Sequence, residues 1–266
     1  MRSKLTFVKR VDYEGLWDRL QGEGRSSFTA AEIRDITGAS AESVRAAVAN
    51  AARKGLLFSP TRGLYVTIPP PFRRWGAVPA AHFIDPMMRH LGCGYYTAFL
   101  SAAAWWGSSH HAVQEYQVVV DRYVRDRTFE RVRLRFHHAQ SVADRQVVRV
   151  AGPQTMLMVS TPEQTAVDLV EHQRWGYGPS NTSTVLAEMP PLDGATLAEL
   201  AGRRPRPVAQ RLGWLLDFLE VDVDLAPLEL LARSGRTTPL SPHSRMTGER
   251  SQRWGVIVNT AVEPDV

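Results

Sequence analysis

The chain has 266 residues, of which 44% are hydrophobic and 22% are charged, and its formal net charge is +5. This composition is typical of a globular protein with one or two domains. No apolar run reaches the roughly 18 residues of a membrane helix, and no secretory signal follows Met1, so we expect a cytoplasmic protein without a membrane partner. The single cysteine, Cys93, excludes an internal disulfide and a zinc site built on paired thiolates.

Positive charge is concentrated in the first quarter of the chain. Residues 1–75 hold 13 basic and 7 acidic side chains, a net of +6, whereas the remainder has a net charge of −1. A basic module joined to a larger neutral body indicates a head that binds a polyanion. The run Pro69-Pro70-Pro71 cannot continue a helix or a central strand and favours an extended spacer. We therefore predict an N-terminal domain over 1–68, a proline-containing linker over 69–90 and a mixed α/β domain with a basic tail over 91–266.

The first domain has the pattern of three short helices. Apolar residues recur at helical spacing from Tyr13 to Leu20, which predicts the first helix. Thr29-Ala30-Ala31-Glu32 has the sequence of a capping box and predicts the start of a second helix, which ends near Gly38. Ser40 is placed to cap a third helix that runs to Lys54-Gly55.

A β-hairpin is predicted after the third helix. Leu56–Phe58 and Leu64–Val66 flank a Pro/Gly turn that carries Arg62. Three helices followed by such a hairpin are the order of a winged helix-turn-helix. The fold class that we predict is therefore α+β, with this winged domain ahead of a larger mixed domain.

The third helix and the turn of the hairpin carry the candidate DNA contacts. A helix fits the major groove of DNA, and its solvent face meets the base edges. We expect base contacts from Ser43, Arg45 and Asn50. Glu42 lies on the same face, where it either reads a cytosine amino group or marks the edge of the footprint. The remaining candidate positions are the helix cap and the phosphate-binding cations, namely Ser40, Arg53, Lys54 and Arg62.

The larger domain is predicted to mix helices and strands. The apolar segment Tyr95–Trp106 predicts a central helix with Trp105 and Trp106 in the core. Thr161-Pro162-Glu163-Gln164 has the sequence of a capping box that opens a helix containing Asp168. Strands are predicted at 116–120, 131–137, 147–150, 156–159 and 254–258, and further helices at 197–201, 208–219 and 227–233.

One predicted strand carries arginines in alternation. Arg131, Arg133 and Arg135 would share the face opposite to the apolar residues. This face is either a solvated surface or, together with Asp168, a surface for a partner or a second nucleic-acid segment.

An enzyme is the first alternative. His110-His111, Asp121, Glu130 and His137-His138 could be assembled into a metal or acid–base site of a nuclease-like protein. However, no lysine follows Lys54 to pair with such carboxylates, and the sequence has neither a phosphate-binding glycine loop nor a nucleophile elbow. We therefore predict no catalytic residue, no metal and no cofactor. A second alternative is a scaffold that uses the winged domain for protein contact.

Several segments in chain order resemble the AbiEi antitoxins. They are Gly63-Leu64-Tyr65, the segment 95–104 followed by Trp106-Gly107, and Ser160-Thr161-Pro162-Glu163 with Asp168-Leu169. These antitoxins belong to type IV, abortive-infection toxin–antitoxin systems of phage defence. The resemblance implies a transcriptional repressor that binds inverted repeats in its own promoter. It also implies opposition to an AbiEii-like nucleotidyltransferase toxin, by direct binding or indirectly.

Overall fold

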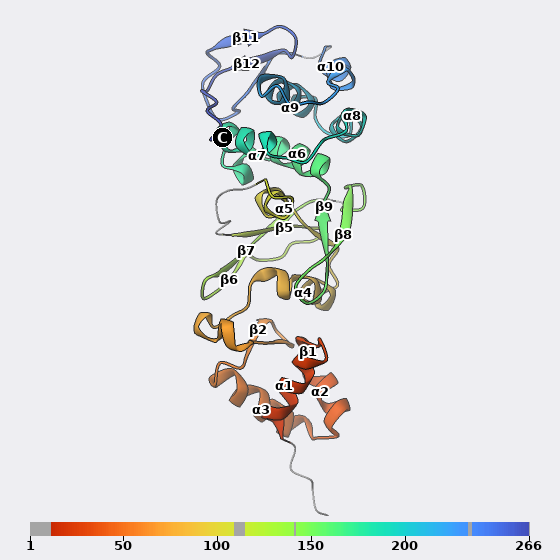
Figure 1. Ribbon diagram of the computed structural model, residues 1–266, viewed down its shortest axis with the longest axis vertical. Helices are drawn as coiled ribbons and strands as arrows, with labels where there is room; N and C mark the ends of the chain where they lie inside the picture. Colours follow the sequence, from red (N-terminus) through yellow and green to blue (C-terminus); the bar gives the residue numbers. More distant parts are fainter. Residues whose placement is uncertain (1–11, 109–114, 141, 234–235, 266) are drawn as a thin grey trace, which may run out of the picture. The chain divides into compact units, whose positions relative to one another are not determined.

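The computed structural model describes residues 12–108, 115–140, 142–233 and 236–265. The chain divides into two compact units, each described separately below (Figure 1). The N-terminal unit comprises residues 1–92 together with the short segments 128–133 and 151–156. The C-terminal unit comprises residues 93–127, 134–150 and 157–266. His110 and His111 lie outside the described residues.

Three helices and a three-stranded antiparallel sheet open the N-terminal unit. The sheet has the order β1-β3-β2, so the predicted hairpin is joined by one further strand that the sequence did not predict. The core lies where Trp17 stacks on Phe28 with ring centroids 5.2 Å apart, and Leu20, Ile33 and Val44 fill it from the helices. The elements are α1 (Tyr13–Gly22), β1 (Ser27–Thr29), α2 (Ala30–Thr37), α3 (Ala41–Arg53), β2 (Leu57–Thr61) and β3 (Leu64–Thr67).

Local capping fixes the ends of α2 and the start of α3. Thr29 and Glu32 form both halves of the predicted capping box, because each side chain bonds the backbone N–H of the other residue. Gly38 then adopts the left-handed conformation with φ of 64°, which favours glycine. Ser40 accepts the N–H of Ser43 at 3.2 Å and starts α3. Only Gly38, Ala39 and Ser40 therefore connect the two helices.

Residues 70–91 are folded rather than extended. They form two 3-10 helices and α4, where the sequence predicted a proline-containing linker, and they belong to the N-terminal unit. Phe83 explains this difference, because its ring packs edge-on against Phe58 at 5.2 Å and against Phe129 at 6.1 Å. The elements are η1 (Pro70–Trp75), η2 (Ala80–His82) and α4 (Ile84–Leu91).

The strands between Tyr95 and Ser160 form a mixed sheet with the strand order β6-β7-β5-β4-β9-β8. Its central strand β4 pairs antiparallel with β5 and parallel with β9, and β5 pairs parallel with β7. Strands are present close to the predicted segments 116–120, 131–137, 147–150 and 156–159, and β4 and β6 are additional. The strands are β4 (Tyr95–Thr97), β5 (Tyr116–Val120), β6 (Arg127–Phe129), β7 (Val132–His138), β8 (Val147–Ala151) and β9 (Met156–Ser160).

The predicted helix over Tyr95–Trp106 is wrong at its start. Residues 95–97 form β4, and the helix α5 (Phe99–Trp105) begins only after a sharp turn in which Phe99 has φ of 52°. Strand β4 is buried on both faces, so its apolar run resembles a continuous helix. Gln117 supplies the cap that Ala98 lacks, since its Oε1 accepts the N–H of Leu100 at 2.9 Å. Trp105 and Trp106 are half-buried rather than core residues.

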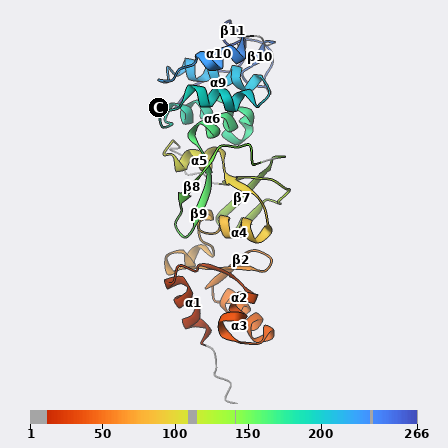
Figure 2. The same cartoon turned by 90° about the vertical axis from the view of Figure 1, so that its right-hand side faces the viewer.

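Six helical segments and a small sheet complete the C-terminal unit. Figure 2 shows α6, α9 and α10 stacked on one another. Trp254 is fully buried at α9, where a Cβ on Gly213 would overlap its indole ring. The small sheet has the order β10-β12-β11. The elements are α6 (Pro162–Glu171), η3 (Gln173–Gly176), α7 (Pro179–Ala187), α8 (Gly194–Gly202), α9 (Pro207–Phe218), α10 (Ala226–Ala232), β10 (Thr238–Pro239), β11 (Glu249–Ser251) and β12 (Val256–Val258).

The predicted cap of α6 is only half formed. Thr161 accepts the N–H of Gln164 at 3.2 Å, as expected of an N-cap. The side chain of Gln164 does not return to Thr161, because it is buried and bonds the N–H of Gln146 and the carboxylate of Asp168 instead. None of the helices in the described ranges is long and apolar enough to cross a bilayer.

Candidate nucleic-acid interface

Helix α3 separates a buried stripe from an exposed face. Val44, Val48 and Ala51 are buried in the core of the N-terminal unit. The opposite face is exposed, and it carries Glu42, Ser43, Arg45, Asn50 and Arg53. The side chains that the sequence analysis assigned to DNA therefore lie on the solvent side of α3.

Two of these side chains already bond neighbours on the protein. Ser43 Oγ lies 3.0 Å from the Tyr13 hydroxyl, and Lys54 forms an ion pair with Glu14. Both contacts are exposed, so they compete with water and cost little to exchange. Ser40 serves as the N-cap of α3 and keeps the start of the helix in place.

Arg45 and Asn50 keep most of their hydrogen-bonding capacity. Arg45 donates only its Nε, to the carbonyl of Ala41 at 3.3 Å, and Asn50 Oδ1 accepts a long bond of 3.4 Å from Arg53. Within the described chain, the guanidinium nitrogens NH1 and NH2 of Arg45 and the amide nitrogen of Asn50 have no hydrogen-bond partner. Arginine recognises guanine and asparagine recognises adenine with these groups.

A residue of α4 contacts the backbone of the turn between β2 and β3. His90 Nε2 lies 3.0 Å from the carbonyl oxygen of Arg62, and Gly63 passes beside the same ring with φ of 87°. The Arg62 side chain is exposed. His90 was missed from the sequence, because the segment that contains it reads as a linker and only the fold brings it to the turn.

Ion pairs leave several arginines of the N-terminal unit uncompensated. Arg19 pairs with Glu23, and Arg89 pairs with Asp85. Across the described part of the N-terminal unit, Arg45, Arg53 and Arg62 are exposed and have no carboxylate partner. Unpaired positive charge of the unit therefore lies on α3 and on the β2–β3 turn. It also lies on Arg34 of α2 and on Arg73 and Arg74 of η1, which are exposed and have no carboxylate partner among the described residues.

The three arginines expected on one strand have different surroundings. Arg131 lies in the turn before β7 rather than in the strand, and Arg133 is exposed on β7. Arg135 is engaged, because it bonds Glu115 at 3.0 Å and Asp126 at 2.8 Å, and these hydrogen bonds raise its pKa. Arg135 is therefore neutralised within the chain.

Asp168 is buried, which corrects its assignment to a surface. Its side chain is 1% exposed, and it accepts hydrogen bonds from Arg145 at 2.9 Å, Tyr96 at 2.9 Å and Gln164 at 2.8 Å. Helix α6 is covered nearly all round, so the polar side of its sequence pattern points into the protein. Asp168 anchors a polar cluster in the core and presents no charge to a partner.

Burial and pairing oppose each other in this cluster. Burial raises the pKa of the Asp168 carboxyl to about 6, although Arg145, Tyr96 and Gln164 favour the charged form. Burial alone would lower the pKa of Arg145, but Asp168, Tyr96 and Glu171 raise it above its ordinary value. At neutral pH both groups are therefore charged, and Glu171 lies 3.2 Å from the same guanidinium.

The side chains that could have formed an enzyme site make contacts within the fold instead. Asp121 accepts the N–H of Gly94 at 3.0 Å, and His137 packs against His172 with ring centroids 4.3 Å apart. Burial lowers the pKa of each of these histidines to about 4, so both are neutral. Within the described residues no group of three or more His, Cys, Asp and Glu side chains is arranged to hold a metal ion.

The chain is thus a two-unit α+β protein whose N-terminal unit exposes uncompensated arginines. Residues 96–218 match the AbiEi antitoxin C-terminal domain, and this match supports an AbiEi-like antitoxin role in a type IV toxin–antitoxin system. The crystal structure of the RV2827C protein from Mycobacterium tuberculosis has a similar fold, with a TM-score of 0.64 and 16% identity over 93% of this chain and 92% of that one. A comparison with curated proteins gave no match.

Proposed function

We propose that the N-terminal unit is a winged helix-turn-helix that binds operator DNA, with α3 in the major groove. The observation that carries this proposal is the face of α3, where Arg45 and Asn50 combine exposure with unused donors. The three-residue connection through Gly38 and the sheet order β1-β3-β2 are typical of such modules. Arg53 and Arg62 would bind phosphates on either side.

We further propose that the chain represses its own operon and opposes a nucleotidyltransferase toxin. The match of residues 96–218 to an antitoxin domain supports the second part. Arg131 and Arg133 are exposed and have no carboxylate partner in the described chain. We propose that these two side chains contact the partner. A growth assay with the toxin under an unrelated promoter tests this part, because repression then cannot contribute.

The test of DNA binding is a gel-shift titration of the full chain with DNA from upstream of its own gene. Arg45→Ala and Asn50→Ala should each cost about 1–3 kcal/mol on the operator and relax its sequence preference. Arg53→Ala and Arg62→Ala should weaken binding on all sequences, and each should reduce the salt slope by about one phosphate contact.

Arg19→Ala is the matched control. Arg19 is an exposed arginine of the same unit, but it pairs with Glu23 directly after α1. Its removal lowers the net charge as much as each of the three arginine variants Arg45→Ala, Arg53→Ala and Arg62→Ala does, and it should leave operator affinity nearly unchanged. Equal losses in the four arginine variants with no loss in Asn50→Ala would show binding by charge alone. No loss in any of the four α3 and turn variants would exclude this interface.

A further inference from the structure

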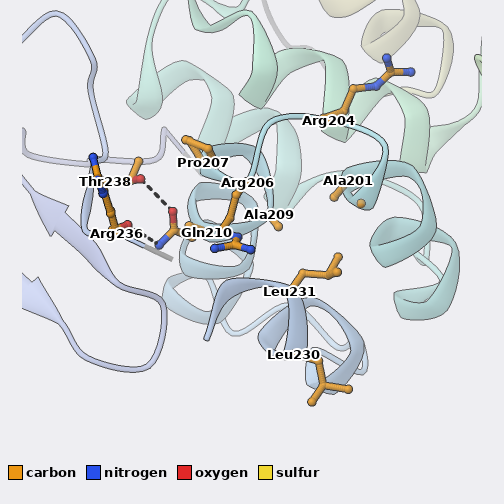
Figure 3. Close-up of a pocket in the computed structure, with 11 residues that line it drawn as sticks. Ala201, Arg204, Arg206, Pro207, Ala209, Gln210, Leu230, Leu231, Arg236 and Thr238 are labelled. Atoms are coloured by element: carbon orange, nitrogen blue, oxygen red, sulfur yellow. Dashed lines mark hydrogen bonds between the residues drawn. The ribbon is translucent and has the colours of Figure 1, made fainter. Parts of the chain in front are cut away.

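A cavity of about 570 Å³ lies in the C-terminal unit, where α8 ends and α9 begins beside α10 (Figure 3). Its volume is within the range of about 300–1,000 Å³ that is usual for small-molecule sites. Arg204, Arg206 and Arg236 are among its lining residues, and no aspartate or glutamate is. The lining therefore favours an anion.

The arginines around the cavity differ in their pairing. Arg203 is bonded to Glu199 on α8, and Arg204 pairs with Asp144 at 3.2 Å. Arg236 is exposed and has no carboxylate partner among the residues that the structure describes. At least one full positive charge at the cavity is consequently uncompensated.

The first turn of α9 adds backbone donors. Pro207 occupies the first helical position, and no side chain caps this end. The N–H groups of Val208 and Gln210 bond the carbonyls of Pro205 and Arg206, but no hydrogen bond in the described ranges uses the N–H of Ala209, which lines the cavity and is 1% exposed. Buried N–H groups are nearly always paired, and a free one at the positive end of a helix dipole is suited to an anion.

Gln210 fixes the backbone of the segment that places Arg236 at the cavity. Its side chain is buried, its Nε2 donates to the carbonyl oxygen of Arg236 at 3.1 Å, and its Oε1 accepts from Thr238 at 2.8 Å (Figure 3). The backbone at Arg236 is thus fixed before any ligand arrives, which lowers the entropy cost of binding.

The cavity also has an apolar side. Leu230 of α10 is 68% exposed, and Leu231 beside it is half-buried. An apolar surface next to the unpaired Arg236 fits a molecule that joins a charged group to a flat or apolar body. We propose that this cavity binds an organic phosphate of mononucleotide size, with the phosphate at Arg236 and the start of α9 and the remainder against Leu230 and Leu231.

The test is isothermal titration of the full chain with each of the four ribonucleoside monophosphates, and with inorganic phosphate as the reference ligand. We expect saturable binding of at least one nucleotide to a single site. Arg236→Ala should weaken it about tenfold, because a charge-assisted hydrogen bond is lost. Leu230→Asp, at an exposed position, should abolish binding by placing a carboxylate in the cavity. Arg203→Ala is the control and should bind as the wild type does.

Four results would overturn the proposal. These are no binding of any nucleotide, unchanged affinity in Arg236→Ala, affinity for inorganic phosphate equal to that for the nucleotides, and saturable binding of polyglutamate without binding of nucleotides. The last result would assign the cavity to an acidic protein segment. Thermal unfolding of each variant separates a lost site from a lost fold.

Discussion

Arg145→Met tests the buried ion pair of the C-terminal unit. The substitution keeps an unbranched apolar stem but removes the guanidinium, which leaves the fully buried carboxylate of Asp168 with only Tyr96 and Gln164 as donors. Breaking a buried pair on one side costs about 3–5 kcal/mol. Because Arg145 is 6% exposed and supplies a full charge to Asp168, we expect a loss of about 4 kcal/mol of unfolding free energy at neutral pH.

The pH dependence of the unfolding free energy should show whether Asp168 has lost its charged partner. Arg145 lowers the pKa of Asp168, so its removal should raise that pKa above about 6. A group whose folded pKa is raised contributes stability that is lost as the pH rises through that pKa. The deficit of Arg145→Met relative to the wild type should therefore grow by about 1.4 kcal/mol per pH unit above pH 6, up to the new pKa.

The assay is urea unfolding followed by tryptophan fluorescence, at several pH values between 6 and 8. Arg203→Met is the control, because its partner Glu199 is on the surface and such a pair is worth less than about 1 kcal/mol. Adding Asp168→Asn to Arg145→Met removes the unpaired charge and should recover part of the loss. A deficit that shrinks as the pH rises, or one no larger than that of Arg203→Met, would refute the reasoning.

Three further predictions concern stability. Gly213→Ala should lower the unfolding free energy by about 3 kcal/mol in urea titration, because the new Cβ overlaps Trp254, whereas an unchanged midpoint would mean that the indole can move. Thr29→Ala should cost about 1 kcal/mol through the lost capping box, and Thr29→Ser should restore most of it. Burial holds the pKa of His137 and His172 at about 4, below the unfolded value, so these residues destabilise the fold as the pH falls from about 6.5. His172→Gln should lose less stability than the wild type between pH 6.5 and 4, and a parallel loss would contradict this.

Local chemistry made the N-terminal helices predictable. The capping box of Thr29 and Glu32 and the cap at Ser40 act within three residues, so the sequence contains everything that they need. The exposed positions of α3 followed from the helical period once its apolar stripe was assigned to the core.

Long-range contacts explain what the sequence did not predict. Strand β4 is apolar on both faces, so its period cannot distinguish it from the helix that follows. The burial of Asp168 depends on Arg145 and Tyr96, which are 23 and 72 residues away along the chain. The fold of residues 70–91 depends on Phe58 and Phe129, which no local pattern connects to Phe83.

The N-terminal unit is not one continuous stretch of chain, since it includes residues 128–133 and 151–156. A ribosome must therefore synthesise the chain as far as residue 156 before the unit that carries α3 is complete. A nascent or prematurely terminated chain that contains all of α1 to α4 but ends before residue 156 still lacks part of that unit. The completion of the unit during translation is thus tied to residues well beyond its own helices.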